Sequence, residues 1–185
     1  MTLESIAGIT PYPLVQVGWS IFEDVETAVA KWVKATGAGP FFTLAHVPLL
    51  NVRYRGTATE FDHTTAVGQW GGVQVELMLQ HCDNPSHITE LCPDRKSKLT
   101  SVSWMAPDMK AEIARMEAQG FPVVWSCNVF DETMTAVWFD TTALLGCFAE
   151  VFVDDPRMRH SFERCAQSAV NWDGSRPLRP MQEMV

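Results

Sequence analysis

Basic residues are scarce in this sequence, where 14 Lys and Arg stand against 22 Asp and Glu and give a formal net charge of −8. Nucleic acids and anionic membrane surfaces are bound through basic patches, so this balance argues against both partners. No apolar run approaches the roughly 20 residues of a membrane-spanning helix. The opening residues, 1–5, also lack the basic-then-apolar pattern of a secretory signal. We therefore expect a cytoplasmic protein.

Closely spaced cysteine pairs are missing too. The five cysteines are scattered along the chain, at Cys82, Cys92, Cys127, Cys147 and Cys165. Cysteine zinc sites need such pairs, and a cytoplasmic setting keeps thiols reduced, so we expect free thiols. The chain instead has 46% hydrophobic and 19% charged residues, which is typical of a globular fold. Its 185 residues suffice for one domain, or for two small modules that share a core.

Two strand-like runs carry a glutamate between apolar neighbours. Residues 73–79 hold Glu76, and residues 146–153 hold Glu150. Side chains alternate between the faces of a strand, and burial of an unpaired carboxylate is costly, so each glutamate needs a cation, a metal or a proton. The sequence therefore predicts two carboxylates that converge on one site. The alternative is a structural salt bridge with an arginine from residues 53–55.

A repeated order of elements surrounds these runs. Each half reads strand–helix–strand–strand–strand, with Asp24 and Asp108 as N-caps of helices whose apolar residues recur at helical spacing. Chance similarity within an α+β chain is the alternative to a true repeat. The expected strands cover 13–21, 41–46, 52–56, 61–69 and 73–80 in the first half, and 99–105, 122–125, 134–139 and 146–153 in the second. Turns are expected at 48–51 and 70–72, a short helix within 83–98, a closing helix at 155–170, and a tail at 171–185 on the outside or on a partner.

Several short motifs follow one another along residues 13–153. They are Gln16-Val17-Gly18-Trp19 before Asp24, Gly37-Ala38-Gly39-Pro40-Phe41-Phe42, Tyr54-Arg55-Gly56, the run from Gly68 to Leu77, Gly120-Phe121-Pro122-Val123-Val124, and Phe139-Asp140-Thr141-Thr142 leading to Glu150. In this order they resemble the vicinal oxygen chelate (VOC) superfamily, the group of glyoxalase I, methylmalonyl-CoA epimerase, extradiol dioxygenases and bleomycin-resistance proteins. The resemblance is to the glyoxalase-like branch that includes the epimerase.

This resemblance implies an α+β fold in which two βαβββ modules form an open barrel. We expect a single glyoxalase-like domain over residues 1–185. Module one covers about 13–92, module two about 99–153, and a C-terminal helix and tail cover 154–185. Because such modules often assemble across subunits in the superfamily, the resemblance also implies a homodimer.

The resemblance further implies a divalent metal inside the barrel. Its four ligand positions fall on Gln16, Glu76, Ser101 and Glu150. Ser101 replaces the histidine that the superfamily usually has, and a neutral hydroxyl is a poor ligand for Zn²⁺ or Fe²⁺. The set that remains consists of hard oxygen donors, which suit Mg²⁺, Mn²⁺ or Ca²⁺. The sequence does not distinguish Mg, Mn, Zn and Fe, and it is equally consistent with no metal.

Without a metal, Glu76 and Glu150 face one cavity as like charges. Each then disfavours ionisation of the other, so one holds a proton near neutral pH and the pair becomes an acid and a base. His63 lies in the expected strand 61–69 and is a candidate for the missing imidazole, as ligand or base. Its alternative is a structural role in the strand.

The candidate substrate-binding residues include Gln16, Ser101, Tyr54, Trp70 and Trp138. The aromatic members fit a pocket for a hydrophobic or aromatic ligand, and core packing is their alternative. Among the remaining histidines, His46 is a candidate for the mouth of the cavity, with a plain loop residue as its alternative, and His81, His87 and His160 are expected at the surface.

These residues favour a lyase or an isomerase of the epimerase kind that abstracts a proton next to a carbonyl. Its substrate is a small hydrophobic or aromatic molecule, and its catalytic residues are Glu76, Glu150 and His63. The alternative is a non-catalytic small-molecule binding or resistance protein of the same fold. Both hypotheses give the chain a small-molecule partner, and neither involves a nucleic acid or a membrane.

Overall fold

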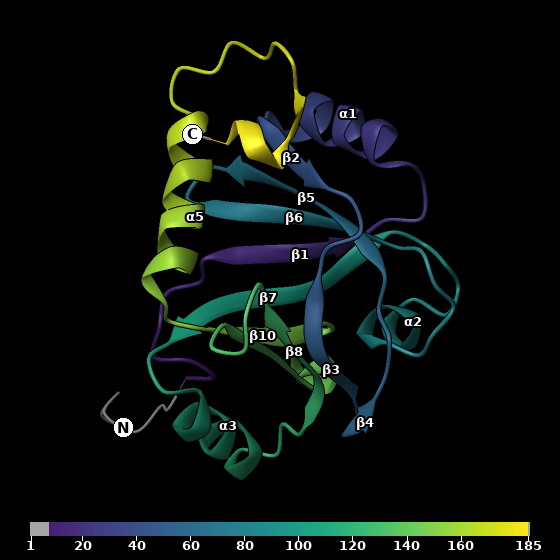
Figure 1. Cartoon of the computed structure of the whole chain (residues 1–185), viewed down its shortest axis with the longest axis vertical. Coiled ribbons are helices and arrows are strands. Elements are labelled where there is room, and N and C mark those ends of the chain that lie inside the picture. Colours follow the sequence, from purple (N-terminus) through teal and green to yellow (C-terminus); the bar gives the residue numbers. More distant parts are fainter. Residues whose placement is uncertain (1–7, 185) are drawn as a thin grey trace.

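The computed structural model describes residues 8–184 of the chain. Within this range the strands form one curled, eleven-stranded sheet in the order β11-β2-β5-β6-β1-β7-β10-β9-β8-β3-β4. Figure 1 shows the strands of the two halves stacked one above the other, with β1 and β7 side by side in the middle. The α+β fold of two βαβββ modules in an open barrel is therefore confirmed.

The first half contains more elements than the repeat predicts. Its elements are β1 (Gln16–Ser20), α1 (Val25–Thr36), β2 (Phe41–Leu44), β3 (Leu49–Tyr54), β4 (Thr57–Ala58), β5 (His63–Trp70), β6 (Val73–Gln80) and α2 (His87–Leu91). The β3–β4 hairpin is inserted between β2 and β5, and β3 pairs with β8 of the second half. A turn was expected at 48–51, but β3 already begins at Leu49 because a distant strand supplies its hydrogen-bond partners.

The second half follows the expected order closely. It contains β7 (Lys98–Ala106), α3 (Met109–Ala118), β8 (Val123–Val129), β9 (Thr135–Phe139), α4 (Thr142–Leu145) and β10 (Phe148–Val153). Helix α4 is one short turn that the sequence did not indicate. The expected N-caps are confirmed in both halves, because the Asp24 carboxylate accepts from the Thr27 amide and the Asp108 carboxylate from the Ala111 amide.

The C-terminal segment packs on the chain itself. It consists of α5 (Pro156–Ser168), β11 (Leu178–Pro180) and the 3-10 helix η2 (Met181–Glu183). Strand β11 pairs in parallel with β2 and extends the sheet at the edge of the first half. In Figure 1, α5 runs across the ends of β5, β6 and β1. The tail is thus part of the sheet and of the cavity described below, and not a loose outer segment.

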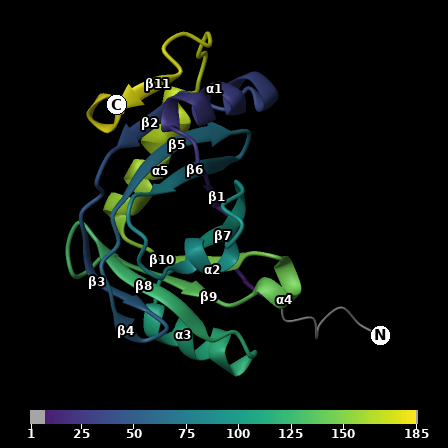
Figure 2. The same cartoon turned by 90° about the vertical axis from the view of Figure 1, so that its right-hand side faces the viewer.

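The outer face of the sheet is covered by one helix in each half. Helix α1 packs on Val75 and Leu77 of β6, and α3 packs on Ala149 and Val151 of β10. Figure 2 shows these two helices at opposite ends of the molecule, outside the curl of the sheet. Because strand side chains alternate, Glu76 and Glu150 point to the other, inner face.

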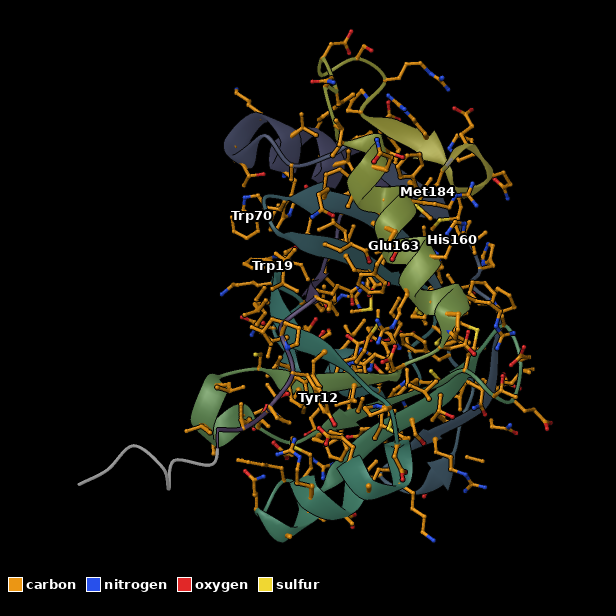
Figure 3. The ribbon with its side chains drawn as sticks, turned by 90° about the vertical axis from the view of Figure 1, so that its left-hand side faces the viewer. Tyr12, Trp19, Trp70, His160, Glu163 and Met184 are labelled. Atoms are coloured by element: carbon orange, nitrogen blue, oxygen red, sulfur yellow. The ribbon has the colours of Figure 1, made fainter. Side chains whose placement is uncertain are left out.

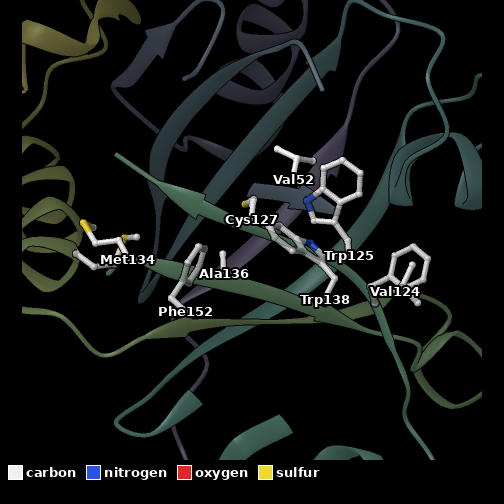
Figure 4. Close-up of a cluster of buried hydrophobic side chains, with 10 residues drawn as sticks. Val52, Val124, Trp125, Cys127, Met134, Ala136, Trp138 and Phe152 are labelled. Carbon is white, nitrogen blue, oxygen red and sulfur yellow. The ribbon is translucent and has the colours of Figure 1, made fainter. Parts of the chain in front are cut away.

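The inner face of the second half is lined by aromatic and sulfur-containing side chains. Trp125, Cys127 and Trp138 are buried there with Phe152, and Figure 4 shows them projecting from β8, β9 and β10 into one space. All five cysteines of the chain are free. None of the helices in residues 8–184 is both long and apolar enough to cross a membrane.

Candidate active site

A cavity of about 380 Å³ occupies the inside of the curled sheet. Gln16, Glu76 and Glu150 contribute polar groups to one part of its wall, and Phe61, Trp125 and Trp138 contribute aromatic rings to another. Side chains of α5 and of the segment around η2 line the remainder. Figure 3 shows two of these residues, His160 and Met184, on the side of the molecule opposite to Trp19 and Trp70. A cavity of this size accommodates a small organic molecule.

Strand register places the two glutamates at equivalent points of the two halves. In the first half β1 pairs in parallel with β6, and Gly18 lies opposite Glu76. In the second half β7 pairs in parallel with β10, and Ser103 lies opposite Glu150. Strands β1 and β7 are antiparallel neighbours, so both carboxyl groups project from the middle of the sheet into the cavity.

Glu150 is buried at 1% exposure and held by two serine hydroxyls. The Ser103 hydroxyl donates to its Oε2 at 2.7 Å, and the Ser101 hydroxyl donates to the same oxygen at 3.0 Å. Burial and the charge of Glu76 raise the pKa of Glu150 to about 8, although the two hydroxyl donors act in the opposite direction. Glu150 is therefore protonated at neutral pH.

Glu76 is more accessible and has fewer partners. It is partly exposed within the cavity, and its Oε1 accepts from the Thr65 hydroxyl at 2.6 Å. Burial raises the pKa of Glu76, and the Thr65 hydrogen bond opposes that rise. The charge of Glu76 raises the pKa of Glu150, so the two carboxyl groups disfavour each other's ionisation.

Gln16 belongs to the same polar network. Its amide nitrogen donates to the Gln74 side-chain oxygen at 2.7 Å, and its own oxygen accepts from the Ser103 hydroxyl at 3.4 Å. Gln16 and Gln74 are register partners on β1 and β6. The network therefore connects the side-chain amides of Gln74 and Gln16 through the Ser103 hydroxyl to Glu150. These amide and hydroxyl groups act as hydrogen-bond partners for one another.

The resemblance implies a divalent metal in the barrel, and such an ion needs several free donor atoms around it. Among residues 8–184 no group of three or more His, Cys, Asp or Glu side chains is placed to hold a metal. At two of the four expected positions the donors are neutral and already engaged: the Ser101 hydroxyl donates a hydrogen bond to Glu150, and Gln16 is hydrogen-bonded to Gln74 and Ser103. A donor set reduced in this way to two carboxyl groups does not fit a divalent cation.

His63 does not replace the missing imidazole. It lies opposite Gln80 in the β5–β6 register, four residues along β6 from Glu76, which corresponds to roughly 13 Å at about 3.3 Å per residue. His63 is buried at 5% exposure, and desolvation lowers its pKa to about 4. A neutral imidazole at that distance lines the cavity but cannot share one ion with Glu76.

His87 lies inside the molecule, in contrast to the surface position expected for it. It is the first residue of α2, is 1% exposed, and lines the cavity. Its ring stacks on Trp138, with centroids 5.1 Å apart and planes 28° apart. Sequence reasoning missed His87 because the surrounding segment 83–98 is polar, and only the Ser86 capping motif indicates that a helix begins there.

Tyr54 and Trp70 lie away from the cavity, so the structure does not bring them into the site. The Tyr54 hydroxyl donates to Glu90 at 2.6 Å, and Arg55 binds the same carboxylate. Trp70 ends β5 at 42% exposure and packs edge-on against Trp32 on the outside. The alternative salt bridge from residues 53–55 to the strand glutamates is likewise not formed, because Arg55 pairs with Glu90.

The remaining histidines lie at the surface. His46 is an exposed loop residue whose Nδ1 is 2.8 Å from the Asp62 carboxylate. His81 is exposed and bonds to the Thr64 hydroxyl at 2.7 Å. His160 is exposed on α5, where it also borders the cavity.

A family model of the Glyoxalase/Bleomycin resistance protein/Dioxygenase superfamily matches residues 16–137, more than half of the chain. The chain therefore belongs to this superfamily, and the resemblance inferred from the sequence motifs is confirmed. The matched range contains both first strands and Glu76 and ends before Glu150.

Solved structures of similar fold agree with this assignment. Methylmalonyl-CoA epimerase from Mycobacterium tuberculosis has a TM-score of 0.53 and 15% identity, over 80% of this chain and 91% of that one. A hypothetical protein from Bacillus halodurans C-125 has a TM-score of 0.52 and 10% identity, over 79% of this chain and 96% of that one. At these identities the likeness shows the fold. A search of curated proteins gives no match to this chain.

Proposed function

We propose that this protein catalyses proton transfer at the carbon next to a carbonyl group, as an isomerase of the epimerase kind or a lyase. One observation carries the proposal: two carboxyl groups from equivalent strands face one cavity in different environments. Their environments separate an ionised group from a protonated one, which is the arrangement that acid–base catalysis requires.

The two glutamates take different roles in this mechanism. In this mechanism Glu76, which is partly exposed to the cavity, is the base that abstracts the proton from carbon. Glu150 is protonated and buried, so it donates a proton or a hydrogen bond to the substrate oxygen as negative charge develops there. Gln16, Ser101 and Ser103 keep Glu150 in place through the hydroxyl network.

The size and lining of the cavity support one class of substrate. About 380 Å³ with a largely aromatic and aliphatic wall fits a small hydrophobic or aromatic carbonyl compound. We expect the chain to act as a homodimer, as superfamily members often do, and size-exclusion chromatography with light scattering checks this expectation. No step of the mechanism is assigned to a metal, because the donors at the ligand positions do not fit one.

Solvent exchange tests the proposal directly. A panel of aryl and alkyl ketones that includes acetophenone is incubated with the protein in D₂O, and proton NMR follows the loss of the protons next to the carbonyl. We expect Glu76→Gln and Glu150→Gln each to lower the exchange rate about 10²–10⁴-fold. His81→Gln, on the surface, is the matched control. Losses below tenfold in both glutamate variants contradict the proposal, as does wild-type protein without exchange on any ketone.

A second candidate function is ligand binding without turnover. The hydroxyls of Ser101 and Ser103 satisfy Glu150 internally, which favours a pocket that holds a ligand without acting on it. Under this hypothesis the protein binds a ketone saturably and returns it with its protons unexchanged. The same NMR experiment therefore separates the two candidates, and the metal content of the purified protein, measured by plasma mass spectrometry, checks the misfit at the ligand positions.

A further inference from the structure

The aromatic part of the cavity wall contains buried polar atoms that have no hydrogen-bond partner. They are both ring nitrogens of His87, Nε1 of Trp138 and Nδ1 of His63. These side chains are 1%, 6% and 5% exposed and all line the cavity. A buried polar group without a partner destabilises a folded protein, so a cluster of them in a cavity wall indicates a group that a ligand supplies.

His87 and Trp138 form one unit within this wall. Their rings are stacked, and Trp125 lies 5.1 Å from the His87 ring on another side. Phe61 packs between this unit and His63, with ring centroids 5.7 Å from His87 and 4.7 Å from His63. The imidazole of His87 is therefore enclosed by apolar rings, and any partner for its nitrogens comes from the cavity or not at all.

The unit lies beside the carboxyl pair. Trp138 on β9 is the register partner of Glu150 on β10. Directly opposed residues of an antiparallel pair have Cβ atoms about 4.5–5.5 Å apart. A ligand atom bound to the Trp138 N–H is thus next to the position where Glu150 and Glu76 act.

The chemistry of the unit defines what it binds. An indole N–H only donates, so the ligand atom must be an acceptor. Desolvation lowers the pKa of His87 to about 3, so its ring is neutral and offers one donor and one acceptor. Neither group carries charge, and the neighbouring carboxyl pair carries one negative charge, which disfavours an anionic group at this point.

We propose that His87 and Trp138 form the anchor for an uncharged acceptor oxygen of the ligand, such as the oxygen of a ketone or a quinone. This inference deepens the proposed function, and it rests on that function only for the place of the reacting carbon. The four unpartnered nitrogens are buried, so a ligand reaches them only if the neighbouring rings turn. Trp125 and Trp138 both contact the His87 ring, so their fluorescence is expected to report binding.

Paired ligands that differ in one oxygen test the anchor. Acetophenone and α-methylstyrene have nearly the same shape, but only acetophenone has an acceptor oxygen. Their affinities are measured by tryptophan fluorescence and by isothermal calorimetry. We expect the wild type to prefer acetophenone about tenfold, since a neutral hydrogen bond contributes modestly and the unit offers two donors. His87→Phe and Trp138→Phe each lower acetophenone affinity about 3- to 10-fold and change α-methylstyrene affinity less than twofold.

The control variants keep this test interpretable. His81→Phe changes a surface histidine outside the cavity and leaves both affinities unchanged. If His87→Phe does not fold, His87→Leu and Trp138→Phe still remove the polar atoms. Thermal melting without ligand is a further readout, because removing the unpartnered nitrogens of His87 raises the melting temperature of the ligand-free protein.

Equal losses for both ligands, or a wild type without preference for acetophenone, overturn the anchor. Such a result leaves the proposed function standing if Glu76→Gln and Glu150→Gln abolish solvent exchange. Conversely, an oxygen preference that His87→Phe removes, together with unchanged exchange in the glutamate variants, supports the anchor and contradicts the proposed function.

Discussion

The two halves of the molecule place a glutamate at the same point of the sheet and treat it differently. In the first half Glu76 faces Gly18 across β1 and β6, is partly exposed, and accepts one hydrogen bond, from Thr65. In the second half Glu150 faces Ser103, is 1% exposed, and accepts two hydrogen bonds from serines. Equivalent positions in the two halves therefore carry two carboxyl groups with different chemical surroundings.

This difference shows how a duplicated site becomes asymmetric without a change of fold. The two surroundings differ mainly in how far each carboxyl group is removed from solvent. Burial raises the pKa of both carboxyl groups, and the charge of Glu76 raises that of Glu150 further. A glycine in one half and a serine in the other are sufficient to alter the partners of the neighbouring side chains.

The largest expected effect is on stability at alkaline pH. The pKa of Glu150 is 4.5 in its ordinary state and about 8 in the folded protein. Stability from this group is therefore complete below its ordinary pKa and is lost as pH rises through 8. We expect urea unfolding of the wild type to lose several kcal/mol between pH 5 and pH 9, and Glu150→Gln to lose far less.

The corresponding substitution in the first half, Glu76→Gln, provides the comparison for this pH dependence of stability. Glu76→Gln removes the charge that raises the pKa of Glu150, so it also reduces the alkaline loss, though it keeps the part that burial of Glu150 causes. Parallel stability curves for wild type, Glu76→Gln and Glu150→Gln from pH 5 to pH 9 would contradict the raised pKa of Glu150 in the folded protein.

The next effect concerns the glycine that faces Glu76. A Cβ at Gly18 would lie 2.2 Å from the Ser101 hydroxyl oxygen, so Gly18→Ala forces a buried, hydrogen-bonded group to move. We expect a loss of about 1–3 kcal/mol in unfolding free energy, the usual range for overpacking. Gly72→Ala meets no atom within 4 Å and is the control. Adding Ser101→Ala to Gly18→Ala recovers part of the loss, and no recovery would refute the steric explanation.

A smaller effect comes from the serine hydroxyls. Ser103→Ala removes the 2.7 Å donor to Glu150, so we expect a loss of about 1 kcal/mol and a further rise in the pKa of Glu150. Carbon-13 NMR of the glutamate carboxyl groups measures that rise. Thr65→Val is the matched change in the first half and raises the pKa of Glu76 instead. A Ser103→Ala variant with unchanged Glu150 titration contradicts this assignment.

The smallest effect is expected where the halves are alike. Asp24 and Asp108 cap α1 and α3 through the same bond to an amide three residues on, at 2.8 and 3.0 Å. Asp24→Ala and Asp108→Ala therefore lower the melting temperature slightly and by similar amounts. A large difference between the two variants would mean that the halves also differ outside the site.

Local patterns were sufficient to predict much of this fold. Alternation in residues 73–79 and 146–153 indicated which side chains face inward, and the capped helices and their order indicated the repeat. The same alternation predicted that Glu76 and Glu150 each lie on the face opposite to their flanking apolar residues, and the repeat predicted that the two groups converge on one site.

The remaining features depend on contacts between distant segments. His87 faces inward because α2 packs so that its ring contacts Phe61 and Trp138. No residue near His87 in the sequence predicts this position. Trp70 and Tyr54 were candidates on residue type alone. Each is the last residue of its strand, and neither lines the cavity. A strand was expected at 52–56, but its earlier start at Leu49 and its pairing with β8 were not evident from the sequence.

That pairing makes the halves interdependent. Strand β3 comes from the first half and forms part of the sheet beside β8, while β11 from the C-terminus completes the edge beside β2. A fragment ending at residue 92 would leave β3 without its β8 partner, and a fragment starting at residue 98 would leave β8 as a sheet edge. We therefore expect residues 8–184 to unfold as one cooperative unit, although the repeat is visible in the arrangement of the strands.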